Sequence, residues 1–515
     1  MPEFDRRVFV KSAAAGAFLA AAPARARAER GRLRGPASAP DQARFSRETV
    51  LALARELARR PYAPPGGDLP APFSSLTYEQ YVGIRGKAGA AIWSDANSPF
   101  LIEPLHRGAG AFATSVALFV VEDGAARPIA YDQNAFDFGK LTVAGKLPDL
   151  GFSGFRVLRT RPDAAPVEVA MLQGQASYRA VARGQSSGVV ARALAIRTAE
   201  AKGEEIPIFR SVWIERPAPA GDSLVIHALL DSESVVGAYR MVLRYGDVTV
   251  TDVETTLIAR VALDHVGVAP MQGTNLFSPL ERRRGGEDMR AAVYEVSGLQ
   301  MHSGAGEWLW RPVANREALQ ISTFVDQNPK MFGLIQRERD FSRFYDDDQH
   351  WELRPSLIVE PLGDWGPGGV QLVEIPAESE NNDNIIAYWR PKAGLAQGVE
   401  TSIAYRQLWC WEPPEPPPLA IATHCRSGRI GAGKRRRFVV EFTGGPIGET
   451  SSDIRADLSA NPGAIAALRT FISRDRKRMR VVFDIDPPGD ASELRLVLAA
   501  DGKPVSETWL YRWTP

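Results

Sequence analysis

The chain has 515 residues, of which 24% are charged, and its formal net charge is +1. This balance gives no global field that would steer the protein to a nucleic acid or an anionic membrane, so a neutral partner is favoured. The length allows two to four average domains, although an all-β unit can exceed about 200 residues as one domain. The 38 prolines and 45 glycines favour strands and turns over helices.

The N-terminus has the pattern of an export signal. Residues 5–11 read Asp-Arg-Arg-Val-Phe-Val-Lys, and an alanine-rich apolar segment and small residues follow. This pattern predicts a twin-arginine signal peptide over residues 1–28, with cleavage after Ala28 or, as an alternative, after Ala26. No later run reaches the ~18 apolar residues of a membrane span. We therefore expect a soluble mature protein in the periplasm of a Gram-negative cell.

Residues 29–75 are predicted to hold a disordered segment, a helix and a proline-rich linker. Residues 31–42 are rich in Arg, Pro, Ala and Gly, which disfavours a packed core. Ser46 can cap a helix that ends at Pro61. The apolar face of this helix consists of Val50, Leu51, Leu53, Ala54 and Leu57.

Residues 76–410 change to short alternating runs broken by Gly, Pro and Asp. These runs predict strands because their side chains alternate with a period of two. The clearest are 223–230, 239–245, 248–261, 320–325, 356–360 and 370–375. No helix-length period alternates with them, so we expect one large antiparallel β-sandwich rather than a parallel sheet.

Residues 411–418 read Trp-Glu-Pro-Pro-Glu-Pro-Pro-Pro and predict an extended linker between two domains. Beyond the linker, residues 419–515 have the size and strand spacing of an immunoglobulin-like sandwich. Its strongest strands are 437–442, 479–485, 494–499 and 508–513, and a short helix is possible at 464–470. Cys410 and Cys425 flank the linker, and the sequence does not decide whether they pair.

The sequence supports no cofactor and no metal. It has no dinucleotide-binding glycine loop, no HExxH and no Gly-x-Ser-x-Gly elbow, and its six histidines lack metal-ligand spacing. The basic run 431–437 precedes a strand and favours a hairpin turn over a phosphate loop. Asp346, Asp347 and Asp348 lack the spacing of a calcium loop and favour a solvated turn.

Acids, aromatics and arginines gather between Tyr294 and Trp389 at strand-like spacing. Aromatic faces can stack on the C–H faces of sugar rings, and carboxylates can bind hydroxyls or supply the acid and base of glycoside hydrolysis. The alternative is that the aromatics are core and the acids solvated. Composition alone leaves both interpretations open.

The order of several motifs resembles the periplasmic glucan biosynthesis proteins G and D, and the apparent twin-arginine signal is typical of the D type. The resemblance covers nearly the whole mature chain to about residue 410 and, more loosely, the C-terminal region through residues 506–509. The segments that carry it are 76–81, 150–155, 177–180, 192–196, 203–207, 213–217, 228–232, 237–240, 306–308, 328–329, 339–341, 363–366, 373–376 and 382–385.

The resemblance implies a large N-terminal β-sandwich with a cleft, a smaller immunoglobulin-like domain, and inverting chemistry on β-1,2-glucan. Asp383, within Asn-Asp-Asn at 382–384, matches the family's general acid. Glu295 falls on the position of the general base, where the family pattern is His-Asp-Ser-x-Gly-Leu and this chain has Tyr-Glu-Val-Ser-Gly-Leu. The carboxylate is retained with one extra methylene, which would displace the attacking water and weaken or redirect hydrolysis.

Seven further residues are candidates for contacts with sugar subsites, because Arg can fork onto hydroxyls and aromatic rings can stack. Each has an alternative role as a core side chain or as one half of an ion pair. The candidates are Arg179, Glu307, Trp308, Arg311, Asp340, Tyr388 and Trp389.

The leading hypothesis is a periplasmic enzyme that hydrolyses or transglycosylates β-1,2-glucan. The alternative is a non-catalytic glucan-binding scaffold that partners the membrane glucan synthase, and the altered base motif keeps this alternative open. We expect no nucleic-acid partner. The sequence does not fix the product linkage, the chain length or the oligomeric state.

Overall fold

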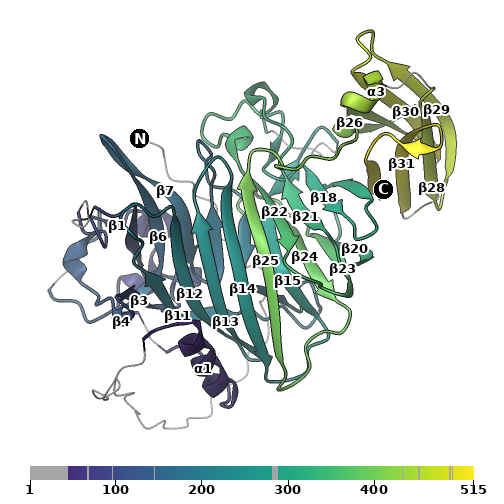
Figure 1. Cartoon of the computed structure of the whole chain (residues 1–515). Helices are drawn as coiled ribbons and strands as arrows, with labels where there is room; N and C mark the ends of the chain where they lie inside the picture. Colours follow the sequence, from purple (N-terminus) through teal and green to yellow (C-terminus); the bar gives the residue numbers. More distant parts are fainter. Residues whose placement is uncertain are drawn as a thin grey trace, which may run out of the picture.

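The structure is a computed structural model that describes residues 44–66, 69–87, 89–94, 97–143, 145–280, 288–431, 433–449, 453–486, 489 and 491–514. The predicted signal peptide and residues 29–42 of the predicted disordered segment lie outside these residues. Strands dominate the described chain (Figure 1), which confirms the all-β class. Across the described ranges, no helix is both long enough and apolar enough to cross a membrane.

Two large sheets form the main body. Within the described residues the first sheet has ten strands, and neighbouring strands pair antiparallel. In spatial order they are β2 (Phe100–His106), β6 (Phe152–Arg161), β7 (Ala164–Gln173), β8 (Ser177–Ala180), β9 (Val190–Arg192), β15 (Val266–Gly273), β24 (Ile385–Pro391), β23 (Pro367–Glu374) and β20 (Gln320–Gln327), with β10 (Leu194–Ile196) beside β15.

The second sheet runs across both parts of the chain and has fifteen strands in the described ranges. In order they are β28 (Arg455–Asn461), β31 (Ser492–Ala500), β33 (Thr508–Trp513), β19 (Trp308–Pro312), β18 (Gly298–His302), β21 (Met331–Ile335), β22 (Ser356–Pro361), β25 (Glu400–Cys410), β14 (Thr249–Ala259), β13 (Val235–Arg244), β12 (Ser223–Asp231), β11 (Ile208–Glu215), β3 (Ala117–Glu122) and β4 (Ala125–Pro128), with β32 (Lys503–Pro504) beside β31.

The main core lies between these two sheets. Alternate residues of the second sheet, such as Leu357, Val359 and Trp409, pack against first-sheet residues such as Phe155 and Val268. Because strand side chains alternate, Ile358 and Leu408 point to the opposite face and belong to another core. The six strands predicted within residues 76–410 are present with closely matching bounds.

Helix α1 (Arg47–Ala58) covers the outer face of β12, β13 and β14 (Figure 1). Ser46 occupies its N-cap in an extended conformation, and its N–H donates to Thr49 Oγ1 at 3.1 Å. Val50, Leu51 and Ala54 are buried against the sheet and Leu57 is partly buried there, as the helical stripe predicted, whereas Leu53 is wrong as a stripe member because it is 37% exposed. The other short elements are α2 (Tyr78–Val82), α3 (Gly445–Glu449), β1 (Arg85–Gly86) with β5 (Phe136–Asp137), β16 (Asn275–Phe277) with β17 (Val293–Tyr294), and 3-10 turns η1 (Phe73–Ser75), η2 (Gly110–Phe112), η3 (Gln133–Ala135), η4 (Phe341–Arg343) and η5 (Trp351–Leu353).

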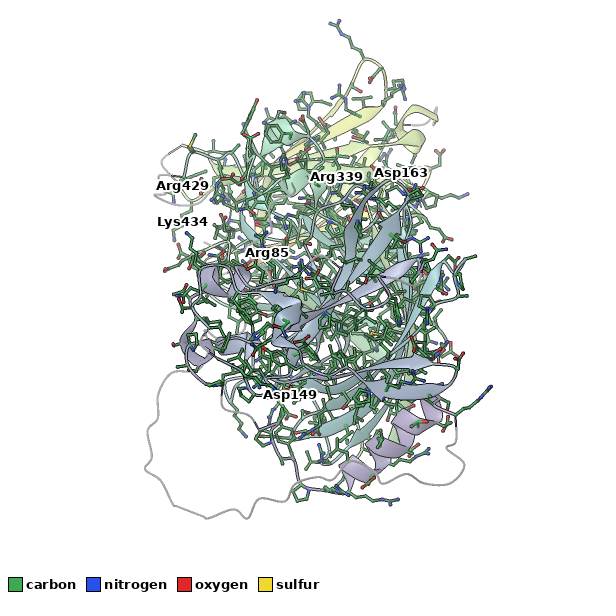
Figure 2. The ribbon with its side chains drawn as sticks, turned by 90° about the vertical axis from the view of Figure 1, so that its left-hand side faces the viewer. Arg85, Asp149, Asp163, Arg339, Arg429 and Lys434 are labelled. Carbon is green, nitrogen blue, oxygen red and sulfur yellow. The ribbon has the colours of Figure 1, made fainter. Side chains whose placement is uncertain are left out.

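The C-terminal part is a sandwich of β28, β31 and β33 against a four-stranded sheet. The order of that sheet is β26 (Ile421–Arg429), β27 (Arg436–Thr443), β30 (Arg478–Asp486) and β29 (Ala464–Ile472). The basic run at 431–437 lies at the β26–β27 hairpin, as predicted, and Figure 2 shows Arg429 and Lys434 near each other there. The helix considered at 464–470 is wrong, because these residues form β29.

The two parts of the chain are joined by a sheet and by a core. Strand β33 pairs in parallel with β19, and Trp310, Ile358 and Cys410 share a core with Phe438 and Trp509. The structure has no disulfide between Cys410 and Cys425. Division at residues 411–418 into two separately folding domains stays a prediction, and the packing is continuous across that point.

A buried ion pair lies at this junction. Glu507 is fully buried, and its two carboxylate oxygens accept from Arg337 Nη1 at 2.6 Å and Nη2 at 2.9 Å. The backbone N–H of Ala422 donates to the same carboxylate at 2.8 Å. The Arg337 guanidinium lies 3.4 Å from the centroid of the Trp310 ring. Both charges are therefore compensated where the two parts meet.

Candidate active site

Three segments distant in sequence meet at one end of β15. Thr274 lies between β15 and β16, and its carbonyl accepts from the N–H groups of Glu295 and Val296 at 2.9 and 3.2 Å. Asn384 begins the approach to β24, and its side chain accepts from the Asn275 N–H at 2.8 Å and donates to the Asn275 carbonyl at 2.9 Å. These backbone ties fix the loops that carry Glu295 and Asp383.

The two candidate acids both bind Thr274. Its N–H donates to Glu295 Oε1 at 3.1 Å, and its hydroxyl lies 3.3 Å from Asp383 Oδ1. Because both contacts are made to one residue, the two carboxylates lie within about 10 Å of each other. The other oxygen of Asp383 accepts from Gln272 Nε2 at 3.0 Å.

The two acids differ in exposure. Asp383 is partly exposed, whereas Glu295 is 4% exposed. A Cβ at Gly273 would lie 3.0 Å from Glu295 Oε1 and 2.7 Å from Val296 Cγ2. Glycine at position 273 therefore leaves the space that the longer glutamate side chain occupies.

Tyr294, the residue before Glu295, is buried. It packs with Phe277, Phe344 and Trp351, and this burial raises the pKa of its phenol. Gln336 Nε2 donates to its carbonyl at 3.1 Å. The residue before Glu295 therefore anchors the loop in an apolar cluster.

A second group of charges adjoins this loop. Arg290 is paired with Asp288, Asp346 and Glu380, and the hydrogen bond to Asp288 is the main cause of its raised pKa. The Glu380 carbonyl lies 3.4 Å from the Thr274 hydroxyl, so this group contacts the residue that binds both acids. Within the described ranges, no cluster of His, Cys, Asp and Glu could hold a metal ion.

The solvated turn predicted at 346–348 is wrong for its first residue. Asp346 is 7% exposed, and its Oδ2 accepts from Arg290 Nη1 at 3.1 Å and Trp351 Nε1 at 2.9 Å. The spacing of the acids could not reveal these partners, because Arg290 is 56 residues away. Asp347 and Asp348 are exposed.

Three of the predicted subsite residues lie inside the protein. Tyr388 and Trp389 are 0% and 1% exposed, because β24 is covered on both faces of its sheet. Tyr388 donates to Gln371 Oε1 at 2.7 Å. Arg311 is 2% exposed and pairs with Glu374 at 2.9 Å. Their contacts favour packing roles, and sugar contact by these residues remains untested.

Two others make their contacts with residues other than the acid pair. Glu307 is exposed and binds Arg495 at 2.9 Å and the Thr508 hydroxyl at 2.7 Å, both in the C-terminal part. Asp340 is exposed and caps η4 by accepting from the Ser342 N–H at 2.9 Å. Hydrogen bonding by the Ser342 side chain and, second, by this Ser342 N–H lowers the pKa of Asp340.

Arg179 lies on β8 of the first sheet. It is 6% exposed and pairs with Glu168 of the adjacent strand β7 at 3.1 Å. The pair fits the alternative role considered from the sequence. Contact between Arg179 and a sugar remains a prediction.

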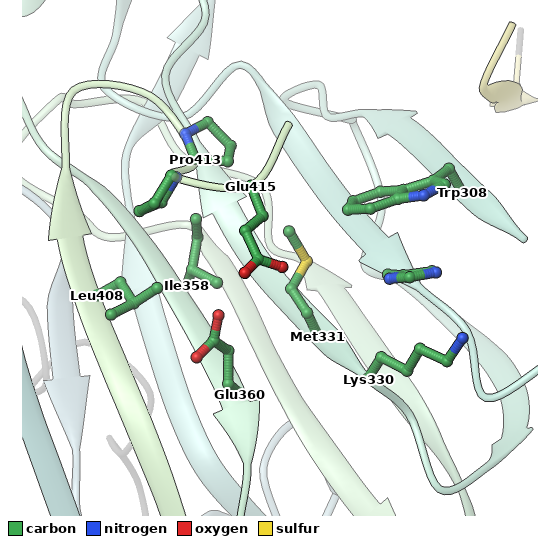
Figure 3. Close-up of a pocket in the computed structure, with 10 residues that line it drawn as sticks. Trp308, Lys330, Met331, Ile358, Glu360, Leu408, Pro413 and Glu415 are labelled. Atoms are coloured by element: carbon green, nitrogen blue, oxygen red, sulfur yellow. The ribbon is translucent and has the colours of Figure 1, made fainter. Parts of the chain in front are cut away.

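Trp308 lines a pocket at the junction. Its ring stacks on His302 with centroids 4.1 Å apart, and the pocket of about 170 Å³ extends to the linker residues Pro413, Pro414 and Glu415. Figure 3 shows the carboxylates of Glu360 and Glu415 directed toward the same space. Burial raises the pKa of Glu360. Neither this pocket nor a second one of about 370 Å³ between β20 and the C-terminal strands includes Glu295 or Asp383.

The residues that join the two acids were not found by sequence reasoning. Gln272 and Thr274 are 8% and 1% exposed; Gln272 lies near the end of the otherwise apolar strand β15, and Thr274 directly follows this strand. The polar residues Gln272, Thr274 and Asn275 at the end of an apolar strand could have indicated a site, because buried polar groups need hydrogen-bond partners.

This architecture is a mostly antiparallel double β-sandwich with paired acids at a strand end. The chain belongs to the family described as "Periplasmic glucan biosynthesis protein, MdoG", whose model matches residues 45–513. It is therefore a member of a glucan biosynthesis family, as the motifs indicated.

Curated relatives cover nearly the whole chain. It is similar to glucans biosynthesis protein G of Rhodopseudomonas palustris strain BisA53, with 41% identity over 482 residues, 93% of this chain and 95% of that protein. It is also 41% identical over 481 residues to glucans biosynthesis protein D of Xanthomonas campestris pv. campestris strain B100, with 90% and 89% covered. The two types match equally well, so identity does not assign the chain to the D type.

Proposed function

We propose that this protein is a periplasmic enzyme that cleaves β-1,2-glucan with inversion, passing the glycosyl group to water or to a sugar hydroxyl. Asp383 acts as the general acid and Glu295 as the general base. Membership of a periplasmic glucan biosynthesis family supports a glucan substrate. The twin-arginine pattern at residues 5–11 supports export to the periplasm.

The observation that carries the proposal is the attachment of both acids to Thr274. Inverting enzymes separate their two carboxyl groups by roughly 6.5 to 9.5 Å, which leaves room for a water opposite the leaving group. The shared contacts limit the separation of the Glu295 and Asp383 carboxyl groups to about 10 Å, which allows such a spacing. Two nearby acids repel each other when both are charged, so packing alone does not favour bringing them together from distant parts of the chain.

Asp383 has the environment that a general acid requires. Its partial exposure allows a glycosidic oxygen to approach, and protonation of that oxygen breaks the bond to the anomeric carbon. Gln272 and Thr274 then stabilise the carboxylate that remains, since each has a donor within hydrogen-bond distance of one of its oxygens. The Thr274 hydroxyl also lies 3.2 Å from the Asn382 carbonyl, so it has an alternative acceptor when Asp383 is protonated.

Glu295 takes the proton from the nucleophile. Its low exposure makes direct access difficult, so a water or a substrate hydroxyl relays the proton to it. A nucleophile held at such a distance is more easily replaced by a sugar hydroxyl than one in direct contact with the base. The extra methylene of the glutamate thus favours transglycosylation over hydrolysis.

Incubation with linear β-1,2-glucan followed by sizing of the products tests this function. Short oligomers indicate hydrolysis, and cyclic or rearranged products indicate transfer; either supports the proposal. The Asp383→Asn protein should leave the polymer unchanged, while Asp264→Asn, at an exposed aspartate of the turn before β15, should behave as wild type. An unchanged polymer with the wild-type protein would contradict the enzymatic function.

The low exposure of Glu295 also favours a second candidate, a non-catalytic scaffold that holds nascent glucan for the membrane glucan synthase. This function needs glucan binding without turnover. In the same assay it predicts measurable binding of β-1,2-glucan by calorimetry, with no change in polymer size.

A further inference from the structure

Strand β29 lies at an outer edge of the protein. It ends the four-stranded sheet, and in the described chain its sheet pairing is with β30 alone. Figure 1 shows this end of the C-terminal sandwich at the corner of the molecule, away from the large sandwich. Its position is therefore remote from Glu295 and Asp383.

This edge strand exposes large apolar side chains on both faces. Leu468 and Ile472 pair with Phe483 and Met479 on the core side, yet each remains 42% exposed. Phe471 pairs with Arg480 on the outer side and is 48% exposed. Long apolar edges promote association unless they are protected, so this strand is expected to meet a partner.

The hairpin that follows β29 is strongly basic. Six of the twelve residues from Arg469 to Arg480 are Arg or Lys and one is Asp, which gives a local net charge of +5. All six cations are exposed: Arg469, Arg474, Arg476, Lys477, Arg478 and Arg480. This local charge contrasts with the near-neutral balance of the whole chain.

The turn between β29 and β30 is fixed by its own hydrogen bonds. Asp475 accepts from the Ser473 hydroxyl at 2.5 Å and from the Lys477 N–H at 3.1 Å. The Arg476 N–H donates to the Ser473 carbonyl at 2.9 Å, and the Gly444 N–H donates to the Lys477 carbonyl at 3.4 Å. The acid is thus used within the turn, and the cations are presented beside Phe471 and Ile472.

We propose that the β29–β30 hairpin docks the protein on an anionic phospholipid surface. Exposed apolar side chains can enter the boundary between head groups and acyl chains, while Arg and Lys bind the lipid phosphates. A second copy of the chain is a poorer occupant, because it would bring two hairpins of the same strong charge together. A soluble acidic protein as the partner would explain the exposed cations, but it would not explain the exposed side chain of Phe471 on the outer face.

Co-sedimentation with lipid vesicles tests this surface on the full mature chain. Wild type should bind vesicles of phosphatidylcholine and phosphatidylglycerol at 7:3 and not vesicles of phosphatidylcholine alone, and roughly 0.5 M salt should weaken binding because it screens the charges. Removal of one surface cation weakens binding about fivefold. Arg474→Glu with Arg478→Glu should therefore lower affinity by at least about 25-fold.

Two further variants separate charge from apolar insertion. Phe471→Ser with Ile472→Ser should weaken binding while leaving its salt dependence unchanged. Lys434→Glu is the matched control, because Lys434 is an exposed cation in the β26–β27 hairpin at the opposite end of the same sheet; it should bind within about twofold of wild type. Every variant should retain the wild-type melting temperature.

Equal binding of wild type to both vesicle compositions, or binding to neither, would overturn the proposal. So would wild-type affinity in the Arg474→Glu/Arg478→Glu protein. Capture on an immobilised acidic peptide without vesicle binding would assign the surface to an acidic protein instead. None of these results depends on glucan turnover, so the surface and the proposed function fail or succeed separately.

Discussion

The junction contains a buried ion pair, whereas the candidate active site contains two acids that both bind Thr274. The two regions differ in what surrounds the carboxyl groups. At the junction, Glu507 is fully buried and an arginine binds both of its oxygens. At the strand ends, Asp383 is partly exposed and its oxygens accept from an amide and a hydroxyl. The first arrangement pairs an acid with a permanent cation, whereas the second holds an acid between an amide and a hydroxyl at a partly exposed position.

This difference separates structural acids from candidate catalytic ones. A buried carboxylate with a bidentate guanidinium is costly to protonate, because the arginine would lose its partner. A partly exposed carboxyl group can instead be reached by a ligand. Glu374, which is 1% exposed and paired with Arg311, falls in the structural class.

The largest effect should come from Asp383→Asn. Loss of the general acid should lower turnover of β-1,2-glucan by about 10³- to 10⁴-fold, because general acid catalysis contributes on that order. The free energy of unfolding should change by less than about 1 kcal/mol, since the amide replaces a partly exposed carboxyl of similar shape. Product release and urea unfolding measure the two effects. Near-native turnover would remove Asp383 from the acid role.

Glu507→Gln should have the opposite pattern. The variant leaves the Arg337 charge without its counter-ion in the junction, which should lower the free energy of unfolding by about 3 to 5 kcal/mol. Turnover per folded molecule should stay near wild type. Glu493→Gln is the control, because Glu493 is exposed in its pair with Arg512 and should cost under about 0.5 kcal/mol. Equal stability of the two variants would contradict the structural role of Glu507.

The buried His106 allows a prediction of how the free energy of unfolding depends on pH. Burial lowers its pKa from 6.5 to about 4, and its ring nitrogens contact the Arg107 carbonyl at 2.6 Å and the Tyr131 hydroxyl at 2.8 Å. Between these pKa values the unfolded chain binds the proton and the folded chain does not. Its contribution is therefore complete above pH 6.5 and falls as the pH drops toward 4.

At pH 4.5 this loss should reach about 2 kcal/mol relative to pH 7. His106→Gln should be less stable than wild type at pH 7, and the gap should narrow by that amount at pH 4.5. Urea unfolding at both pH values measures it, with the exposed His424→Gln as the control. A gap of constant size would mean that His106 is not kept neutral by burial.

Glu295→Gln should have a smaller effect than Asp383→Asn. We expect a loss of about 10- to 100-fold in turnover, since transfer to a sugar hydroxyl needs less help from a base. Parallel rate measurements on the two variants decide the order. If the loss at Glu295 equals or exceeds that at Asp383, Glu295 is an indispensable base and relayed transfer is wrong.

The smallest effect should come from Thr274→Val, which removes the hydroxyl near Asp383 but keeps the N–H that binds Glu295. We expect kcat to fall about tenfold with KM little changed, because one hydrogen bond to a charged group is worth roughly 1.5 kcal/mol. Thr274→Ser should restore most of kcat. A rise in KM alone would show that Thr274 shapes glucan binding and does not position the acid.

The sequence correctly predicted those strands and helices whose local residue pattern favours the same structure that packing with distant residues imposes. Strand alternation located β12, β13 and β14, and Ser46 with its apolar stripe located α1. It was wrong about β29, where Ala-Ile-Ala-Ala-Leu-Arg-Thr combines good helix formers, because pairing with β30 overrides a weak propensity.

The site was predictable only in part. Motif resemblance proposed Asp383 and Glu295 as the acid and the base, and these roles stay predictions. Thr274 and Gln272 bind Asp383 across more than 100 residues, a distance that no local pattern spans. Tyr388 and Trp389 were proposed as sugar contacts because aromatics suit stacking. Their strand is covered on both faces, and such burial depends on neighbours that are distant in sequence.

Proton NMR of the first product formed from linear β-1,2-glucan tests the central claim most directly. An acid and a base on opposite faces of the sugar ring predict inversion, so the new anomeric centre should appear as α, whether at a reducing end or in a new linkage. A β-configured first product, or no new anomeric signal at all, would contradict inverting catalysis by Asp383 and Glu295.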